Sequence, residues 1–139
     1  MCLSSHSTNE YTRAILDHYV REGYIKVWKI LGRDHTGFIT GAFHGVRYRK
    51  GLRKAEGDMT IRGTGGWYGY LSKPRERAYP NRIVCCWARR RWVIEVERGH
   101  DFSSRHPRKV RLQMLVFPAY RKKQMSFLEA WKACEAAGE

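Results

Sequence analysis

Residues 82–97 read RIVCCWARRRWVIEVE, and this stretch decides the kind of fold that the chain can form. Ile83, Val84, Cys85, Cys86 and Trp87 put apolar side chains on both faces of an extended segment, which is typical of a strand in the middle of a sheet. A second strand is predicted over 92–97. The arginine triplet between the two segments indicates either a highly charged turn or a bulge in one long strand.

The residues before this stretch predict a helix and then a hairpin. Ser7 and Glu10 have the spacing of a capping box, and apolar side chains at helical spacing predict a helix over 8–22, with 1–7 frayed. Aromatic and β-branched residues predict a strand over 24–31, followed by a turn over 32–37 and a returning strand over 38–43. A hairpin therefore leads into the middle of the chain.

The middle of the chain, residues 44–66, is rich in glycine and has a weaker pattern. Short strands near 45–49 and 58–62 are expected on either side of a basic stretch, and another strand is expected over 67–71. Ser72 is placed to cap a short helix over 72–79, which Pro80 would end. This part predicts short elements rather than one long one.

The last third predicts a loop, a strand and a helix. Residues 99–108 are expected to form the loop, and apolar and polar residues then alternate over 109–117, which indicates a half-buried strand with Lys109, Arg111 and Gln113 on its polar face. Ser126 and Glu129 form a second capping box at the start of a helix. An apolar stripe of this helix is expected to pack on the core; it consists of Phe127, Leu128, Trp131 and Cys134.

These elements predict one α+β domain over residues 1–139, with a mostly antiparallel, twisted sheet flanked by an N-terminal and a C-terminal helix. The hydrophobic content of 42% and the aromatic content of 13% argue against a disordered basic tail. No apolar run approaches the roughly 18 residues of a membrane span, and the N-terminus lacks the pattern of a signal peptide. The expected setting is soluble, in the cytoplasm or the interior of a host cell.

The four cysteines and six histidines form no pattern of a metal or redox site. No C-x-x-C pair is present, and no histidine lies in an H-E-x-x-H or zinc-finger arrangement, so no metal is expected. We expect Cys85 and Cys86 to be reduced, buried thiols. A nucleophilic role for either thiol is not favoured, since a central strand would bury it.

The formal charge of +14 is concentrated in the middle of the chain. Residues 44–123 contain 21 Lys and Arg against 6 Asp and Glu, a balance of +15, whereas the remaining residues contain 6 against 7, a balance of −1. The excess comes from four clusters. They are Arg47-Arg49-Lys50-Arg53-Lys54, Arg89-Arg90-Arg91, Arg105-Arg108-Lys109-Arg111 and Arg121-Lys122-Lys123.

This charge predicts an acidic partner, namely nucleic acid or an acidic protein or nucleoprotein surface. Phosphate backbones attract such a surface through counterion release, and arginine suits bidentate contact with phosphate. Trp67, Tyr68 and Tyr70 are candidates for stacking on unpaired bases. No helix-turn-helix, RNA-recognition signature or zinc finger is present, so no mode of groove recognition is assigned. Small size and high charge also fit an accessory protein of a phage or mobile element that inhibits a host complex.

A second hypothesis concerns catalysis. Phe43-His44-Gly45, Gly66-Trp67-Tyr68-Gly69 and Glu95-Val96-Glu97 follow one another in an order that resembles the ADP-ribosyltransferase pattern. The resemblance implies that NAD is the cofactor, that His44 holds its ribose, that Tyr68 stacks on nicotinamide and that Glu95 or Glu97 stabilises the cationic transition state. In a simpler interpretation, the two glutamates pair with arginines of neighbouring strands at the surface. The serine-hydrolase and Walker motifs are absent from the sequence.

Overall fold

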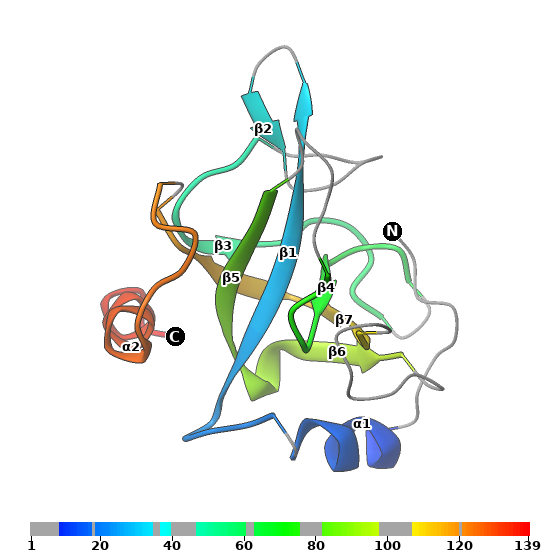
Figure 1. Cartoon of the computed structure of the whole chain (residues 1–139). Coiled ribbons are helices and arrows are strands. Elements are labelled where there is room, and N and C mark those ends of the chain that lie inside the picture. The colour runs from blue at the N-terminus through cyan, green and yellow to red at the C-terminus, as the bar shows by residue number, and fades with distance from the viewer. Residues whose placement is uncertain are drawn as a thin grey trace.

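An antiparallel sheet with one helix near each end of the chain forms the fold (Figure 1). The structure is a computed structural model that describes residues 9–17, 19–34, 37–39, 47–60, 63–75, 82–97, 107–119 and 121–139. The elements are α1 (Asn9–Leu16), β1 (Tyr24–Asp34), β2 (Gly37–Ile39), β3 (Gly51–Lys54), β4 (Trp67–Tyr70), β5 (Arg82–Arg89), the 3₁₀ turn η1 (Arg90–Trp92), β6 (Val93–Val96), β7 (Lys109–Leu112), β8 (Met114–Phe117) and α2 (Phe127–Ala136).

Seven of the strands lie in the order β3-β8-β5-β1-β4-β7-β6, and β2 pairs with the end of β1. Every pairing between these strands is antiparallel. The predicted α+β class, with a mostly antiparallel sheet and two flanking helices, is confirmed.

The centre of the sheet is the long β1–β5 pair, whose register runs from Tyr24 opposite Arg89 to Leu31 opposite Arg82. Val27 and Cys86 face each other in this register and are fully buried, and Cys85 is buried on the other face. The prediction that 82–88 is a central strand with two reduced, buried thiols is confirmed. Burial raises the pKa of Cys85 to about 11, so its thiol is protonated and unreactive at neutral pH.

The segment 109–117 is not one half-buried strand, as the sequence predicted, but two strands separated by Gln113. β7 pairs with β4 and β6, whereas β8 pairs with β3 and β5, so this segment connects distant positions of the sheet. The backbone of Gln113 is still satisfied, since its N–H donates to Trp92 (2.8 Å) and its carbonyl accepts from Ala55 (2.8 Å). Arg111, predicted on the solvent face, is buried.

Two of the predicted helices differ from the structure, the one over 8–22 and the one over 72–79. α1 ends at Leu16 instead of residue 22, because Arg21 and Tyr24 exchange backbone hydrogen bonds across a turn in which Glu22 and Gly23 have φ of 54° and 80°. The predicted helix over 72–79 is absent from its described part, 72–75. Its other residues lie outside the described ranges.

The weak sequence pattern of residues 44–66 predicted a strand at the wrong position. β3 lies at Gly51–Lys54, within the stretch predicted to be a basic loop. The described residues of the two strands expected beside it, 47–49 and 58–60, form no strand of the sheet. Residues 40–43 of the second hairpin strand lie outside the described ranges, while β2 confirms its start.

α2 confirms the second capping box but only half of its predicted stripe. The Ser126 hydroxyl accepts a hydrogen bond from the Glu129 N–H (3.2 Å). Ala130 and Cys134 are buried against the sheet, whereas Leu128 is 55% and Trp131 42% exposed. The helix packs through positions spaced by three and four residues, and 128 and 131 are rotated away from that face.

Replacing Ser126 with alanine tests this cap. Ser126→Ala is expected to lower the free energy of unfolding by about 1 kcal/mol, because the Glu129 N–H loses its acceptor. Urea denaturation followed by circular dichroism measures the change. Gln124→Ala, an exposed position just before the helix, is the control, and an equal loss in both variants would contradict a capping role.

Candidate nucleic-acid interface

Six basic residues gather where β3 begins and β8 ends. Gly51 pairs with Phe117, so the segment that enters β3 and the segment that leaves β8 meet at one edge of the sheet. All six side chains are exposed. We call this set the basic edge; it consists of Arg47, Arg49, Lys50, Arg121, Lys122 and Lys123.

Tyr48 fastens the first of these segments to the second. Its hydroxyl donates a hydrogen bond to the carbonyl of Pro118, and its ring packs edge-on against Phe117 with centroids 5.6 Å apart. Burial raises the pKa of Tyr48, so the hydroxyl keeps its proton and remains a donor. The flanking basic residues are thereby held on a fixed backbone.

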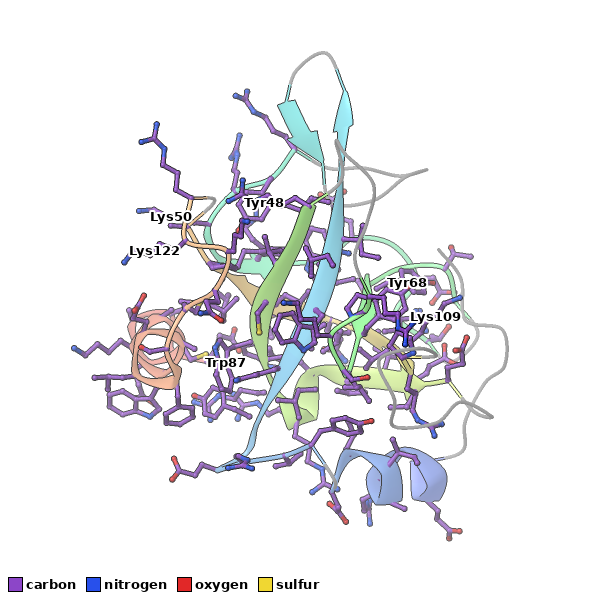
Figure 2. All side chains as sticks on the ribbon, viewed as in Figure 1. Tyr48, Lys50, Tyr68, Trp87, Lys109 and Lys122 are labelled. Atoms are coloured by element: carbon purple, nitrogen blue, oxygen red, sulfur yellow. The ribbon has the colours of Figure 1, made fainter. Side chains whose placement is uncertain are left out.

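The second segment is fastened by backbone hydrogen bonds. Lys122 donates to Ala119 (2.9 Å) within a turn, and the carbonyl of Lys123 accepts from the N–H of Cys85 in β5 (2.8 Å). Lys123 has a φ of 62° and ends this turn. Figure 2 shows Lys50 and Lys122 on the same side of the molecule, both pointing away from the sheet, with Tyr48 between them and the strands.

Within the described part of the chain, the basic edge has no carboxylate partner. Six positive charges on two adjoining segments repel one another. An arrangement of this kind is stabilised by a polyanion that bridges the charges. The predicted clusters around 47–50 and 121–123 are therefore brought together by the strand register.

The arginine triplet lies where β5 ends and contacts the two helices. Arg89 pairs with Glu135 (3.6 Å), and Arg90 pairs with Asp17 (2.8 Å). Arg91 donates to a backbone oxygen of Glu139 (2.6 Å). Of the two alternatives that the sequence left open, the highly charged turn is confirmed: the segment forms the 3₁₀ turn η1 between β5 and β6, and not a bulge in one long strand.

The remaining predicted basic residues do not form one surface. Arg108 is buried and donates to the carbonyl of Glu97 (2.7 Å), and Lys109 lies 3.9 Å from the Glu97 carboxylate. Arg53 is half-buried in β3, and Lys54 pairs with Glu139 at 3.7 Å. Arg105 lies outside the described ranges.

Trp67, predicted as an exposed stacking residue, belongs to the core. It is 8% exposed, its indole N–H donates to the carbonyl of Arg53 (3.0 Å), and its ring packs edge-on against Phe117. Tyr68 is half-buried on the opposite face of β4, and its carbonyl accepts from Lys29 (2.5 Å). Alternation along a strand puts neighbouring aromatic residues on opposite faces, so only one of this pair can face outward.

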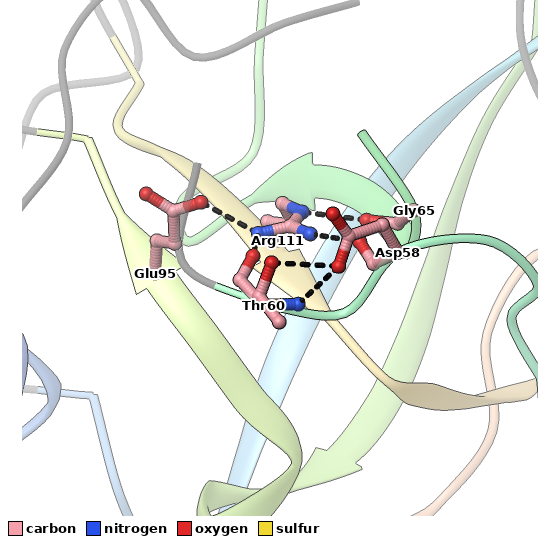
Figure 3. Close-up of polar contacts among 5 residues, drawn as sticks. All are labelled: Asp58, Thr60, Gly65, Glu95 and Arg111. Carbon is pink, nitrogen blue, oxygen red and sulfur yellow. Dashed lines mark hydrogen bonds and ion pairs between the residues drawn. The ribbon is translucent and has the colours of Figure 1, made fainter. Parts of the chain in front are cut away.

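A buried ion pair occupies the place where the sequence suggested a catalytic glutamate (Figure 3). Arg111 Nη1 lies 2.6 Å from Glu95 Oε1, and both side chains are 1% exposed. The same guanidinium donates to the carbonyls of Asp58 (2.6 Å), Thr60 (2.9 Å) and Gly65 (2.5 Å). Glu95 thus pairs with an arginine of a neighbouring strand, as the simpler interpretation expected, but Glu95 and Glu97 are buried and do not lie at the surface.

Two members of the ADP-ribosyltransferase pattern lie in one row of the sheet. Tyr68 of β4 and Glu95 of β6 both stand opposite Arg111 of β7. The third member, His44, lies outside the described ranges, so the pattern stays a prediction. No group of three or more His, Cys, Asp or Glu arranged to hold a metal ion occurs among the described residues.

The chain matches no protein-family model, and comparisons with curated proteins and with solved structures find no match. None of the helices in the described ranges is long and apolar enough to span a membrane.

One basic residue beside the arginine triplet, Arg13, was not predicted from the sequence, because α1 lies in the part of the chain with no excess charge.

Proposed function

We propose that the protein binds nucleic acid, either free or within a nucleoprotein complex, through the basic edge. The observation that carries this proposal is the convergence of six exposed Lys and Arg side chains, without carboxylate partners in the described chain, on two adjoining backbone segments. Bound in this way, the protein could mask the nucleic acid of a host complex, as expected of a phage or mobile-element accessory protein.

The chemistry of the basic edge favours contact with phosphates over contact with base edges. Lys and Arg neutralise phosphates and release condensed counterions, so affinity falls steeply with salt. Six contacts to a duplex predict a slope of log affinity against log salt of about −5. Tyr48 is held in the sheet by Pro118 and Phe117, so among the described residues of these two segments no aromatic ring is free to stack on a base. Binding with little sequence preference is therefore expected.

Charge reversal within the basic edge tests this proposal. Lys50→Glu/Lys122→Glu is expected to weaken binding of a labelled duplex or single strand by about tenfold or more and to reduce the salt slope by about 2, because two phosphate contacts are lost. Fluorescence anisotropy at several salt concentrations measures both quantities, and parallel DNA and RNA probes show which is preferred.

The matched control reverses the same number of charges elsewhere. Arg21 and Lys132 are exposed, and neither belongs to the basic edge. Arg21→Glu/Lys132→Glu has the same net charge as the test variant and is expected to bind nearly as well as the unmodified protein. Equal losses in both variants would assign binding to net charge alone. Absence of binding at low salt would refute the proposal.

A further inference from the structure

A second site lies where β5 ends, at Arg89. A hollow of about 500 Å³ opens between α1, the turn at Gly23 and the junction of β5, η1 and β6. The basic edge meets β5 at Cys85, whose N–H donates to the carbonyl of Lys123, whereas the hollow lies four residues further on, at Arg89. No residue of the basic edge lines the hollow, so the two are separate sites.

Four arginines line this hollow, one from α1 and three from the β5–η1 junction. They are Arg13, Arg89, Arg90 and Arg91. The backbone holds the two groups together, since the N–H of Arg90 donates to the carbonyl of Gly23 (2.9 Å) and its guanidinium donates to the carbonyl of Arg13 (3.2 Å). Four arginines around one concave space make its surroundings positive and favour an anionic ligand.

The carboxylates that pair with these arginines are not part of the lining. Asp17 and Glu135 hold Arg90 and Arg89 from outside the hollow, at 2.8 and 3.6 Å. These pairs fix the positions of the guanidinium groups and leave other N–H groups available. Arg89 Nε is buried without a hydrogen-bond partner in the structure.

The rest of the lining is apolar. Leu16 closes the hollow from α1, and Val93 and Ile94 close it from β6. Inorganic phosphate gains no binding free energy from these apolar side chains. A ligand that also carries a planar organic group buries them and can stack on an arginine side chain. A volume of about 500 Å³ lies within the range of small-molecule sites, which is roughly 300–1,000 Å³.

We propose that this hollow binds a nucleoside phosphate, with the phosphate among the arginines and the nucleoside against the Leu16, Val93 and Ile94 wall. The ligand is either a free nucleotide or the phosphorylated end of a nucleic-acid strand. This site does not depend on the basic edge, and each can fail without the other.

Isothermal titration calorimetry with the four ribonucleoside 5′-monophosphates, measured one at a time on the full chain, tests the site. Arg13→Gln/Arg91→Gln is expected to weaken the best of these ligands by about tenfold or more, since two charged donors are lost. Ile94→Trp, which fills the hollow and removes no charge, is expected to weaken it similarly. Arg21→Gln/Arg75→Gln removes two exposed arginines that do not line the hollow and is expected to leave affinity unchanged.

The matching unphosphorylated nucleoside and inorganic phosphate are expected to bind more weakly than the monophosphate. Competition by a 5′-phosphorylated oligonucleotide, but not by its 5′-hydroxyl form, identifies a strand end as the ligand, and competition by mononucleotides alone identifies a free nucleotide. Monophosphates that fail to bind, or that bind Arg13→Gln/Arg91→Gln as tightly as the unmodified protein, overturn the proposal. Lys50→Glu/Lys122→Glu is expected to keep this affinity, which separates the two sites.

Discussion

Arg111→Met is expected to destabilise the fold by about 3–5 kcal/mol. The change leaves the Glu95 carboxylate, which is 1% exposed, without the cation 2.6 Å away. It also removes the donor shared by the carbonyls of Asp58, Thr60 and Gly65, so the loop that they form loses its attachment to β7. Urea denaturation at neutral pH measures the loss, and faster proteolysis within residues 56–66 is expected to accompany it.

A second replacement separates the buried charge from the loop contacts. In Arg111→Met/Glu95→Met the unpaired carboxylate is gone, so part of the lost stability is expected to return, because removing both members of a buried pair is far less costly than removing one. The loop carbonyls still lack their donor, so recovery is expected to be incomplete. Arg75→Met, at an exposed position, is the control. A cost below about 1 kcal/mol for Arg111→Met would contradict a structural role for this pair.

The glycines of this loop explain why it can fold over Arg111. A Cβ atom on Gly65 would lie 2.4 Å from the backbone of Gly57, and one on Gly63 would lie 2.5 Å from the carbonyl of Asp58. The backbone approaches itself this closely only where side chains are absent. The glycine-rich stretch at 63–66 therefore serves a compact loop closed by the Gly65 N–H donating to Asp58 (2.8 Å).

The sequence predicted the elements whose pattern is local. Apolar residues on both faces identified β5, and the spacing of Ser126 and Glu129 identified the start of α2. The prediction for Arg111 was wrong, because the alternation of apolar and polar residues was taken to mean that one face of the strand packs on the core and the other faces solvent. The second face of β7 is covered by Glu95 and by the loop containing Asp58, and no local pattern shows that cover.

For the candidate site too, local sequence located the positive charge, but the contacts between distant residues that assemble the site were not predictable. Composition located the positive charge in residues 44–123, and the basic edge lies within this range. The pairing of Gly51 with Phe117, which unites its two halves, depends on register between strands more than 60 residues apart. Arg13 was overlooked for a related reason, since a single arginine on a nearly neutral helix becomes part of a cluster only when α1 packs beside η1.

Lys29→Met is expected to benefit stability more at pH 7 than above pH 10.5, by roughly 3 kcal/mol. Loss of the hydrogen bond to the Tyr68 carbonyl offsets part of this gain at every pH. Lys29 points into the core from β1, is 5% exposed, and has the carbonyl of Tyr68 as its acceptor at 2.5 Å. Burial lowers the pKa of Lys29 from its ordinary value of 10.5 to about 8, against a smaller opposing effect of Cys86. Protonating this amine therefore costs free energy in the folded state that the unfolded state does not bear.

The sign of the pH dependence follows from these two values. Below pH 8 both states carry the proton, so the full cost is present and the variant has its largest advantage. Between pH 8 and 10.5 the folded state releases the proton first, so the stability of the unmodified protein rises relative to the variant. Above 10.5 the amine is neutral in both states, and the advantage due to charge is lost.

Urea denaturation of both proteins from pH 6.5 to 11 measures this difference directly. Groups such as Cys85 and Tyr48, whose pKa values are raised by burial, titrate in both proteins and largely cancel in the difference. Lys26→Met is the matched control, because Lys26 lies three residues away on the opposite, exposed face of β1. Its effect on stability at pH 7 is expected to be small. A Lys29→Met advantage that stays constant from pH 7 to 10.5 would show that the amine is not a desolvated cation at neutral pH.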